Sequence, residues 1–449
     1  MIRGLFLSLT FLLVPLLSSS QESGENLRKG HLSGQWRNYY MSTINNGALT
    51  DFTALATGGY LKYTFRVSER LTLGAALYNT THLGGMDLTH PDPSTGRISR
   101  YEAGLFDGLD LANDAVFLLG EAYISYHLPE HRFKLGRMKI NSPLINPQDG
   151  RMIPTLVQGF WYEFQPEKTF KFQLGLLNEI APRSTGEFFG IGESIGTYPE
   201  GRSPEGTPNG YPGNTVSDFI LMVNTAVKIT DALQIHLWDY LVENVSNSLY
   251  INPRFTLSPS LQLDGEWLHQ DRVGEGGNPL DSLRYFYQRN ADILGVRLTY
   301  KKNRSRISLA YERILPNGQF LSPREWGREG LFSFQKRERS EGTADNHALV
   351  IYYHTRFPVK RDLFEIQSVF SLGRHWKPSV LDAAANKYAI PDYTHLNLDF
   401  FFHLEKLKAL KPELLLTAKF ANGDVPDNPN FYFNKVDMFH LSFVLNYNF

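Results

Sequence analysis

Apolar and polar residues alternate along many segments of the chain, and the C-terminal segment shows the pattern most clearly. Large apolar residues occupy six consecutive alternate positions from Phe439 to Phe449, and most of the positions between them are polar. Successive side chains of a β-strand point to opposite faces. The pattern therefore predicts a strand over 438–449 with one apolar face, which ends on Phe449.

The same alternation recurs in segments upstream, and the connections between them follow a second pattern. Strand-like segments include 71–78, 170–177, 249–257 and 395–404. Short connections are predicted near 67–70, 129–131, 165–169, 230–232, 258–260, 302–304, 357–361 and 405–410. Longer polar or Gly/Pro-rich connections alternate with them, near 42–53, 79–114, 141–158, 181–216, 243–247, 270–290, 315–343, 374–392 and 421–434.

Eight short turns and nine long loops join 18 strands. Strands of about ten residues are long enough to cross a bilayer at a tilt, and segregation of short and long connections is typical of outer-membrane barrels. The sequence therefore predicts an all-β fold, an 18-stranded antiparallel transmembrane barrel with short periplasmic turns and long extracellular loops.

The N-terminus predicts export of the chain. A short basic start, an apolar run over 4–17 and small residues at 18–20 have the layout of a secretory signal peptide. We therefore expect residues 1–20 to be a signal peptide and residues 21–449 to form a single barrel domain.

Composition narrows the class of protein further. The 449 residues include 13% aromatic and 42% apolar residues, no cysteine and a formal net charge of -1. The aromatic content excludes a disordered chain, the lack of cysteine excludes disulfides and thiolate metal sites, and the near-neutral charge argues against nucleic-acid binding. A mean hydropathy of -0.30 fits a barrel in which every second residue faces lipid, with aromatic girdles at the strand ends.

No sequence motif indicates catalysis. The 13 histidines are scattered, and neither a Gly-x-Ser-x-Gly nor a His-Glu-x-x-His motif occurs. We expect no enzymatic activity, no cofactor and no metal site. Two alternatives to a channel remain: an adhesin or receptor barrel that binds partners through loops 181–216 and 315–343, and a barrel that exports an acidic polysaccharide.

Loop 141–158 is the strongest candidate for a constriction inside the barrel. Pro143, Pro147 and Pro154 stiffen it, and the pair Asp149-Gly150 is a turn signal. Asp149 and Arg151 then place opposite charges on one rigid element, as a selectivity constriction requires.

Several charged residues fall on the predicted lumen face of the strands. The basic ones form a candidate ladder of Lys171, Arg254, Arg297 and Arg306, and the candidate acidic side consists of Asp264, Glu266 and Asp399. A row of such cations could pass an anionic group along the lumen. Cross-lumen ion pairs are the alternative, because Asp264 and Glu266 lie one strand from Arg254. The charge-dense segment 324–341 mixes both signs and predicts a solvated loop, with lipopolysaccharide phosphates as an alternative partner.

The stretch from Lys134 to Phe160 resembles the third-loop region of the OprD-type substrate-specific porins. The positions that carry the match are Asp149, Gly150, Arg151, Pro154 and Gly159. The resemblance implies an 18-stranded bacterial outer-membrane barrel for passive, selective diffusion of small polar solutes that bear carboxylates, such as amino acids and organic acids. The partners we expect are outer-membrane lipids and lipopolysaccharide, small-molecule solutes, and the barrel-assembly machinery, which would read the C-terminal strand ending in Phe449; we expect no nucleic acid.

Overall fold

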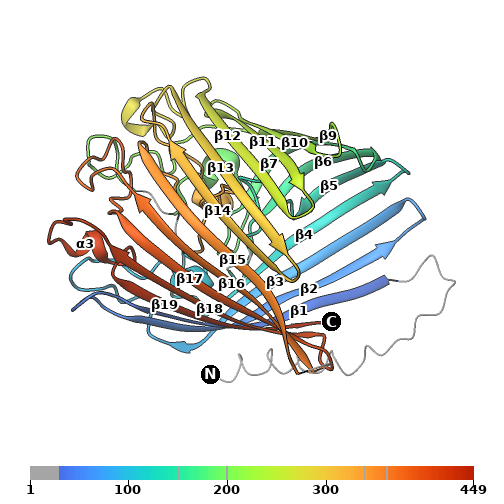
Figure 1. Cartoon of the computed structure of the whole chain (residues 1–449), viewed down its shortest axis with the longest axis horizontal. Helices are drawn as coiled ribbons and strands as arrows, with labels where there is room; N and C mark the ends of the chain where they lie inside the picture. The colour runs from blue at the N-terminus through green and yellow to red at the C-terminus, as the bar shows by residue number, and fades with distance from the viewer. Residues whose placement is uncertain (1–29, 149–150, 199–200, 338, 361–362) are drawn as a thin grey trace.

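Eighteen long β-strands form one closed antiparallel barrel in the computed structural model of the chain (Figure 1). The structure describes residues 30–449 except 149–150, 199–200, 338 and 361–362, so the predicted signal peptide lies outside the described residues. The long strands are β1 Gly30–Ile44, β2 Phe52–Arg66, β3 Leu71–Gly85, β4 Ala115–His127, β5 His131–Met138, β6 Leu156–Glu167, β7 Phe170–Ala181, β9 Ile220–Lys228, β10 Leu233–Val242, β11 Ser246–Ser258, β12 Leu261–Arg272, β13 Asn290–Lys302, β14 Ser305–Ile314, β15 Asn346–Lys360, β16 Phe364–Trp376, β17 Tyr393–Leu404, β18 Leu410–Ala421 and β19 Met438–Asn448. The prediction of an 18-stranded barrel is confirmed.

The first and last long strands close the barrel. β1 pairs with β2 on one side and with β19 on the other. In the pair with β19, the facing residues run from Gln35 and Asn448 at one end to Ile44 and Phe439 at the other. Beyond β19, the Phe449 amide donates to the Gly34 carbonyl at 3.1 Å, and the Gly34 amide donates to the Phe449 carbonyl at 2.8 Å. Closure leaves no free sheet edge, so the backbone groups of the wall are satisfied between strands, as hydrocarbon requires.

The alternation seen in the sequence separates the two faces of the wall. In β19, Phe439 and Phe443 are exposed on the outer surface, whereas His440, Ser442 and Val444 are buried on the inner one. Exposed aromatic residues include Tyr63, Tyr126 and Tyr300 toward strand ends, and Trp267, Tyr311 and Tyr353 nearer the middle of their strands. The outer surface is thus apolar and rich in aromatic residues, as a lipid-facing surface requires.

Short and long connections lie at opposite ends of the barrel, as predicted, with one exception: the connection predicted as long near 243–247 has only the three residues 243–245. The short ones are 67–70, 128–130, 168–169, 229–232, 259–260, 303–304, 361–363 and 405–409. The long ones include 86–114, 139–155, 182–219, 315–345 and 377–392.

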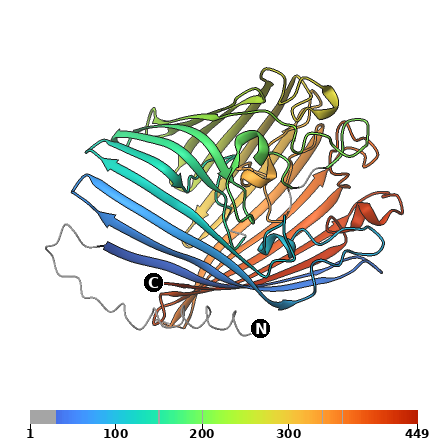
Figure 2. The ribbon, with the colours of Figure 1, turned by 180° about the vertical axis from the view of Figure 1, so that it is seen from behind.

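The short elements belong to the long loops, and some lie inside the barrel. They are β8 Phe189–Gly190, which pairs with β7, and the helical turns η2 Ala103–Leu105, α2 Ile191–Ser194, η3 Asp281–Leu283, η4 Arg324–Trp326 and α3 Pro429–Tyr432. Figure 2 shows α2 and η4 next to each other within the barrel, where Trp326 Nε1 donates to Ser194 Oγ at 2.8 Å. In the described part of the chain, no helix has the length and apolar character needed to cross a membrane.

Candidate functional site

Loop 139–155 enters the barrel between β5 and β6 and packs against the inner wall at β10. Leu144 and Ile145 belong to a buried apolar cluster that also contains Tyr240 of β10. The Asn146 amide donates to the Trp326 carbonyl at 3.2 Å, which joins this loop to loop 315–345. The two loops therefore form one packed body inside the lumen.

Residues 331–337 of loop 315–345 run along the inner wall, and we call this segment the strap. Its hydrogen-bond and ion-pair partners come from β12 and then from each strand from β14 to β19. In order along the strap, these partners are Glu266 of β12, Glu312 of β14, Tyr352 of β15, Ser371 of β16, Asp399 of β17, Lys419 of β18 and Ser442 of β19. The wall thus contacts every residue from 332 to 337, some through the strap backbone and the others through strap side chains.

Some side chains of the strap pack against the wall and others line the lumen. Gln335 is buried against the wall and donates to Ser371 Oγ at 2.8 Å. Phe334 and Arg337 are half-buried and line a cavity on the lumen side. The strap therefore gives the lumen a second surface, in addition to the barrel wall.

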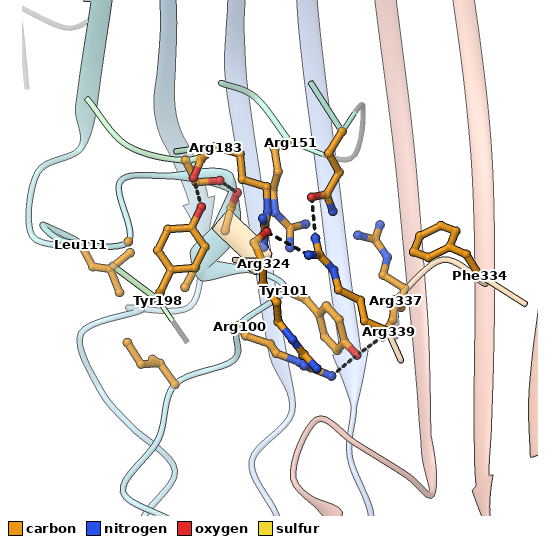
Figure 3. Close-up of a pocket in the computed structure, with 16 residues that line it drawn as sticks. Arg100, Tyr101, Leu111, Arg151, Arg183, Tyr198, Arg324, Phe334, Arg337 and Arg339 are labelled. Carbon is orange, nitrogen blue, oxygen red and sulfur yellow. Dashed lines mark hydrogen bonds between the residues drawn. The ribbon is translucent and has the colours of Figure 1, made fainter. Parts of the chain in front are cut away.

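The strap, loop 139–155 and two further loops enclose a cavity of about 220 Å³ (Figure 3). Six arginines line it, and we call it the arginine cavity: Arg100, Arg151, Arg183, Arg324, Arg337 and Arg339. Its other lining residues include Ile98, Leu111 and the rings of Tyr101, Tyr198 and Phe334. Among the described residues, no aspartate or glutamate lines it. Guanidinium groups recognise carboxylates in bidentate geometry, so this wall is suited to small anions.

Burial and mutual repulsion act on the arginines of this cavity. Burial, together with the positive charges of Arg183 and Arg337, lowers the pKa of Arg151 to about 9. Arg151 therefore stays charged at neutral pH. The charge of Arg324 is compensated by a carboxylate, because its Nε lies 2.6 Å from Glu341 Oε2 in a buried ion pair.

The arginine cavity is the second of four cavities that share lining residues. An outer cavity of about 950 Å³ shares Ile98, Arg100 and Tyr198 with it. On the other side, Phe334 lines both the arginine cavity and an inner cavity of about 390 Å³. A fourth cavity, of about 530 Å³ near the turn 303–304, shares Arg306 with the inner one. The four cavities follow one another from the long loops toward the short turns, each sharing at least one lining residue with the next, and we call this series the route.

Two of the four predicted ladder residues lie on this route. Arg297 and Arg306 both line the inner cavity. Arg297 is ion-paired with Asp264 at 3.1 Å and packs over the ring of Phe332 at 4.1 Å. Arg306 Nη2 lies 3.3 Å from His354 Nδ1. These two arginines continue the series of basic residues toward the periplasmic end, in a cavity that Glu329 and Asp399 also line.

The other two ladder residues face the lumen beside carboxylates. Arg254 Nε lies 2.8 Å from Asp264 Oδ1, and Lys171 Nζ lies 2.8 Å from Glu163 Oε2. Neither residue lines any of the four cavities.

Each predicted acidic residue has a polar partner. Asp264 is buried between Arg254 and Arg297. Glu266 lies under the strap and accepts hydrogen bonds from the Tyr250 hydroxyl at 2.9 Å and from the strap. Asp399 pairs with Lys336 of the strap at 2.8 Å. These carboxylates hold arginines and the strap in place.

The predicted constriction residues have different outcomes. Arg151 lines the arginine cavity, whereas Asp149 and Gly150 lie outside the described residues.

The prediction of a solvated loop over 324–341 is wrong, because Arg324, Glu325, Glu329 and Glu341 are each at most 3% exposed. The arginines of this segment were visible in the sequence, but nothing in their irregular spacing indicated that the loop folds inward.

Comparisons with known proteins agree with this architecture. The fold is similar to that of Pseudomonas aeruginosa OpdK crystallised with vanillate (TM-score 0.67, 13% identity, covering 94% of this chain and 98% of that one). It is also similar to Pseudomonas aeruginosa OccK3 (OpdO) (TM-score 0.64, 15% identity, 94% and 96%) and to Acinetobacter baumannii OccAB4 (TM-score 0.65, 13% identity, 94% and 98%).

The sequence comparisons identify the family. No curated protein matches the chain significantly. The family model described as "outer membrane porin, OprD family" matches residues 124–348, which is half of the chain. The chain belongs to the OprD family of outer membrane porins.

Proposed function

We propose that this outer-membrane porin passes small polar solutes that bear a carboxylate group, such as amino acids and organic acids, by passive selective diffusion. The observation that carries the proposal is the arginine cavity, where six guanidinium groups surround about 220 Å³. Buried guanidinium groups in a low-dielectric site attract carboxylates more strongly than they would in water.

Basic residues in the cavities on either side of the arginine cavity also favour anions over cations. Arg97 and Arg202 line the outer cavity, and Arg297 and Arg306 line the inner one. In this proposal Arg297 and Arg306 pass the anion onward, and Arg254 and Lys171 add to the positive potential of the lumen. Asp149 and Arg151 shape the field at the constriction, and Asp264, Glu266 and Asp399 anchor the basic groups.

A structural neighbour offers a parallel for this chemistry. The OpdK crystals contained vanillate, which is a small aromatic carboxylate. The fold is shared at low sequence identity, so the parallel concerns only the class of solute.

Proteoliposome swelling tests the carboxylate preference. Gluconate and sorbitol have the same carbon skeleton and differ mainly in the carboxylate. We expect faster swelling in isotonic sodium gluconate than in isotonic sorbitol. Equal rates for the two solutes would remove the carboxylate preference while leaving the porin assignment intact.

Reversal potentials in a salt gradient test the ladder separately. The double variant Arg297→Gln/Arg306→Gln should lower the preference for anions over cations, because both side chains line the inner cavity. Arg254→Gln should have a smaller effect, since that group is paired with Asp264 away from the four cavities. Unchanged selectivity in the double variant would exclude the ladder.

Lipid and assembly contacts complete the proposal. We place lipopolysaccharide around the extracellular border of the wall, and we assign recognition by the barrel-assembly machinery to β19 and Phe449. The apolar outer face of β19 and its closing position beside β1 support both assignments.

A further inference from the structure

We propose that the arginine cavity selects small solutes with two anionic groups over monoanions of the same length. This inference rests on the proposed function and narrows its substrate class. It is carried by two guanidinium groups, those of Arg183 and Arg337, for which the described residues provide no carboxylate within ion-pair distance.

Arg183 is the first of these groups. Its side chain is 5% exposed, and its Nε and Nη1 atoms are buried without a hydrogen-bond partner among the described residues. Its guanidinium lies over the ring of Tyr198, 5.2 Å from the ring centre, and it lines the arginine cavity. Unsatisfied buried donors are costly, particularly when charged. A bound anion would satisfy them.

Arg337 of the strap is the second group. Its Nη2 donates to the hydroxyls of Tyr39, at 3.0 Å, and Ser442, at 2.7 Å. Both hydrogen-bond partners are hydroxyls, and the buried Glu102 carboxylate, which acts on Arg337 electrostatically, forms no ion pair with it among the described residues. The strap backbone holds the residue in place, because Lys419 Nζ donates to the Arg337 carbonyl at 2.8 Å.

The two groups lie on different sides of the cavity. In Figure 3, Arg183 is on the left with Tyr198 and Arg337 is on the right with Phe334. Arg151 experiences the positive charge of both, which places it within electrostatic reach of each. A solute with one anionic group can satisfy one side of the cavity, whereas a solute with two can reach both.

The remaining wall suits a short carbon chain between the two anionic ends. Ile98, Leu111 and the ring of Tyr101 supply apolar surface to the lining. The volume of about 220 Å³ is below the roughly 300–1,000 Å³ of sites for drug-sized ligands. We therefore assign small dianions, for which four-carbon dicarboxylates are suitable probes.

Current block of single channels tests the inference with butyrate and succinate, which have the same number of carbons and carry one and two charges at pH 7.5. We expect succinate to remain bound roughly tenfold longer than butyrate or more, as one additional charge-assisted hydrogen-bonded contact would give. Arg183→Gln and, independently, Arg337→Gln should each reduce this ratio toward one.

Arg70→Gln is the matched control, since Arg70 is exposed in the turn 67–70 and should leave the ratio unchanged. Equal residence times in the wild-type channel, or an undiminished ratio in both cavity variants, would overturn the inference. Neither outcome affects the gluconate and sorbitol comparison, so failure of the dianion preference can be distinguished from failure of the carboxylate preference.

Discussion

Individual buried charges determine the character of this lumen. Arg324 is 3% exposed and donates from Nε to Glu341 Oε2 at 2.6 Å and from Nη2 to the Glu341 carbonyl at 2.9 Å. Its guanidinium also lies 3.7 Å from the centre of the Tyr388 ring. These contacts hold Arg324 at the cavity wall, and the buried Glu341 carboxylate compensates its charge.

Removing Arg324 should destabilise the packing of loops 139–155 and 315–345 inside the barrel. Arg324→Ala leaves Glu341 buried without its closest cation, and breaking a buried pair in this way typically costs about 3–5 kcal/mol. We expect a lower urea midpoint for the protein in lipid vesicles. Lys408→Ala removes the cation of the exposed pair with Glu405 and should change the midpoint little. Equal midpoints for the two variants would contradict the structural role of Arg324.

Residues on strands were more predictable than residues in loops. The period of two correctly placed Arg254, Arg297 and Asp264 on the lumen face, because strand geometry fixes the direction of every second side chain. It could not indicate which of them would be paired, since pairing depends on the register between strands. Arg183 and Arg337 belong to irregular backbone with no period, so their convergence on one cavity was not predictable.

At the scale of elements, the strap divides the route through the barrel. Phe334 borders the arginine cavity on one side and the inner cavity on the other. The Tyr352 hydroxyl donates to the Phe334 carbonyl at 3.0 Å, which fixes the backbone that carries the ring.

Shortening this side chain should widen the route. Phe334→Ala removes a ring at the boundary of the two cavities, and we expect a larger single-channel conductance. Phe420→Ala is the control, because Phe420 of β18 is 53% exposed on the outer surface and should leave the conductance unchanged. A wild-type conductance in Phe334→Ala would mean that the narrowest point lies elsewhere.

Loop 315–345 should also respond to pH. Burial raises the pKa of Glu325 and of Glu329 from 4.5 to about 7. Between pH 4.5 and about 7 the folded loop binds more protons than the unfolded loop. The stability that protonated Glu325 and Glu329 contribute is therefore present at low pH and is lost as the pH rises through 7. Glu325 Oε1 also accepts a hydrogen bond from the Gly196 amide at 2.5 Å, which ties the titrating loop to loop 182–219.

Hydrogen exchange measures this effect directly. After correction for intrinsic rates, amides of 315–345 should exchange faster at pH 8 than at pH 5, while amides of β15 should show no such difference. Glu325→Gln removes one titrating group and should weaken the pH dependence. Identical profiles for the variant and the wild type would exclude Glu325 as a source.

At the scale of the whole molecule, the first and last long strands, β1 and β19, close the barrel. The number of strands and the separation of short and long connections were predictable, because both follow from the spacing of the period-two segments. The packing of loops 139–155 and 315–345 inside the barrel was not, because it depends on contacts between residues far apart in sequence, such as Asn146 with Trp326.

The C-terminal residue should matter for assembly. Phe449 pairs with Gly34 through two backbone hydrogen bonds, and its ring lies 6.3 Å from that of Tyr447. Deletion of Phe449 removes these contacts at the closing seam, so we expect less folded barrel in outer-membrane fractions, measured as the heat-modifiable band on gels. Substitution of the lipid-facing Phe420 by Ala serves as the control. Unchanged yield after the deletion would argue against an assembly role.

Planar-bilayer recording of the purified protein tests the central claim most directly. A selective anion route through the arginine cavity predicts discrete current steps and a reversal potential on the anion side in a salt gradient. An adhesin, a receptor or a dedicated polysaccharide exporter need not conduct small ions. The absence of any ion current from correctly folded protein would contradict the channel function.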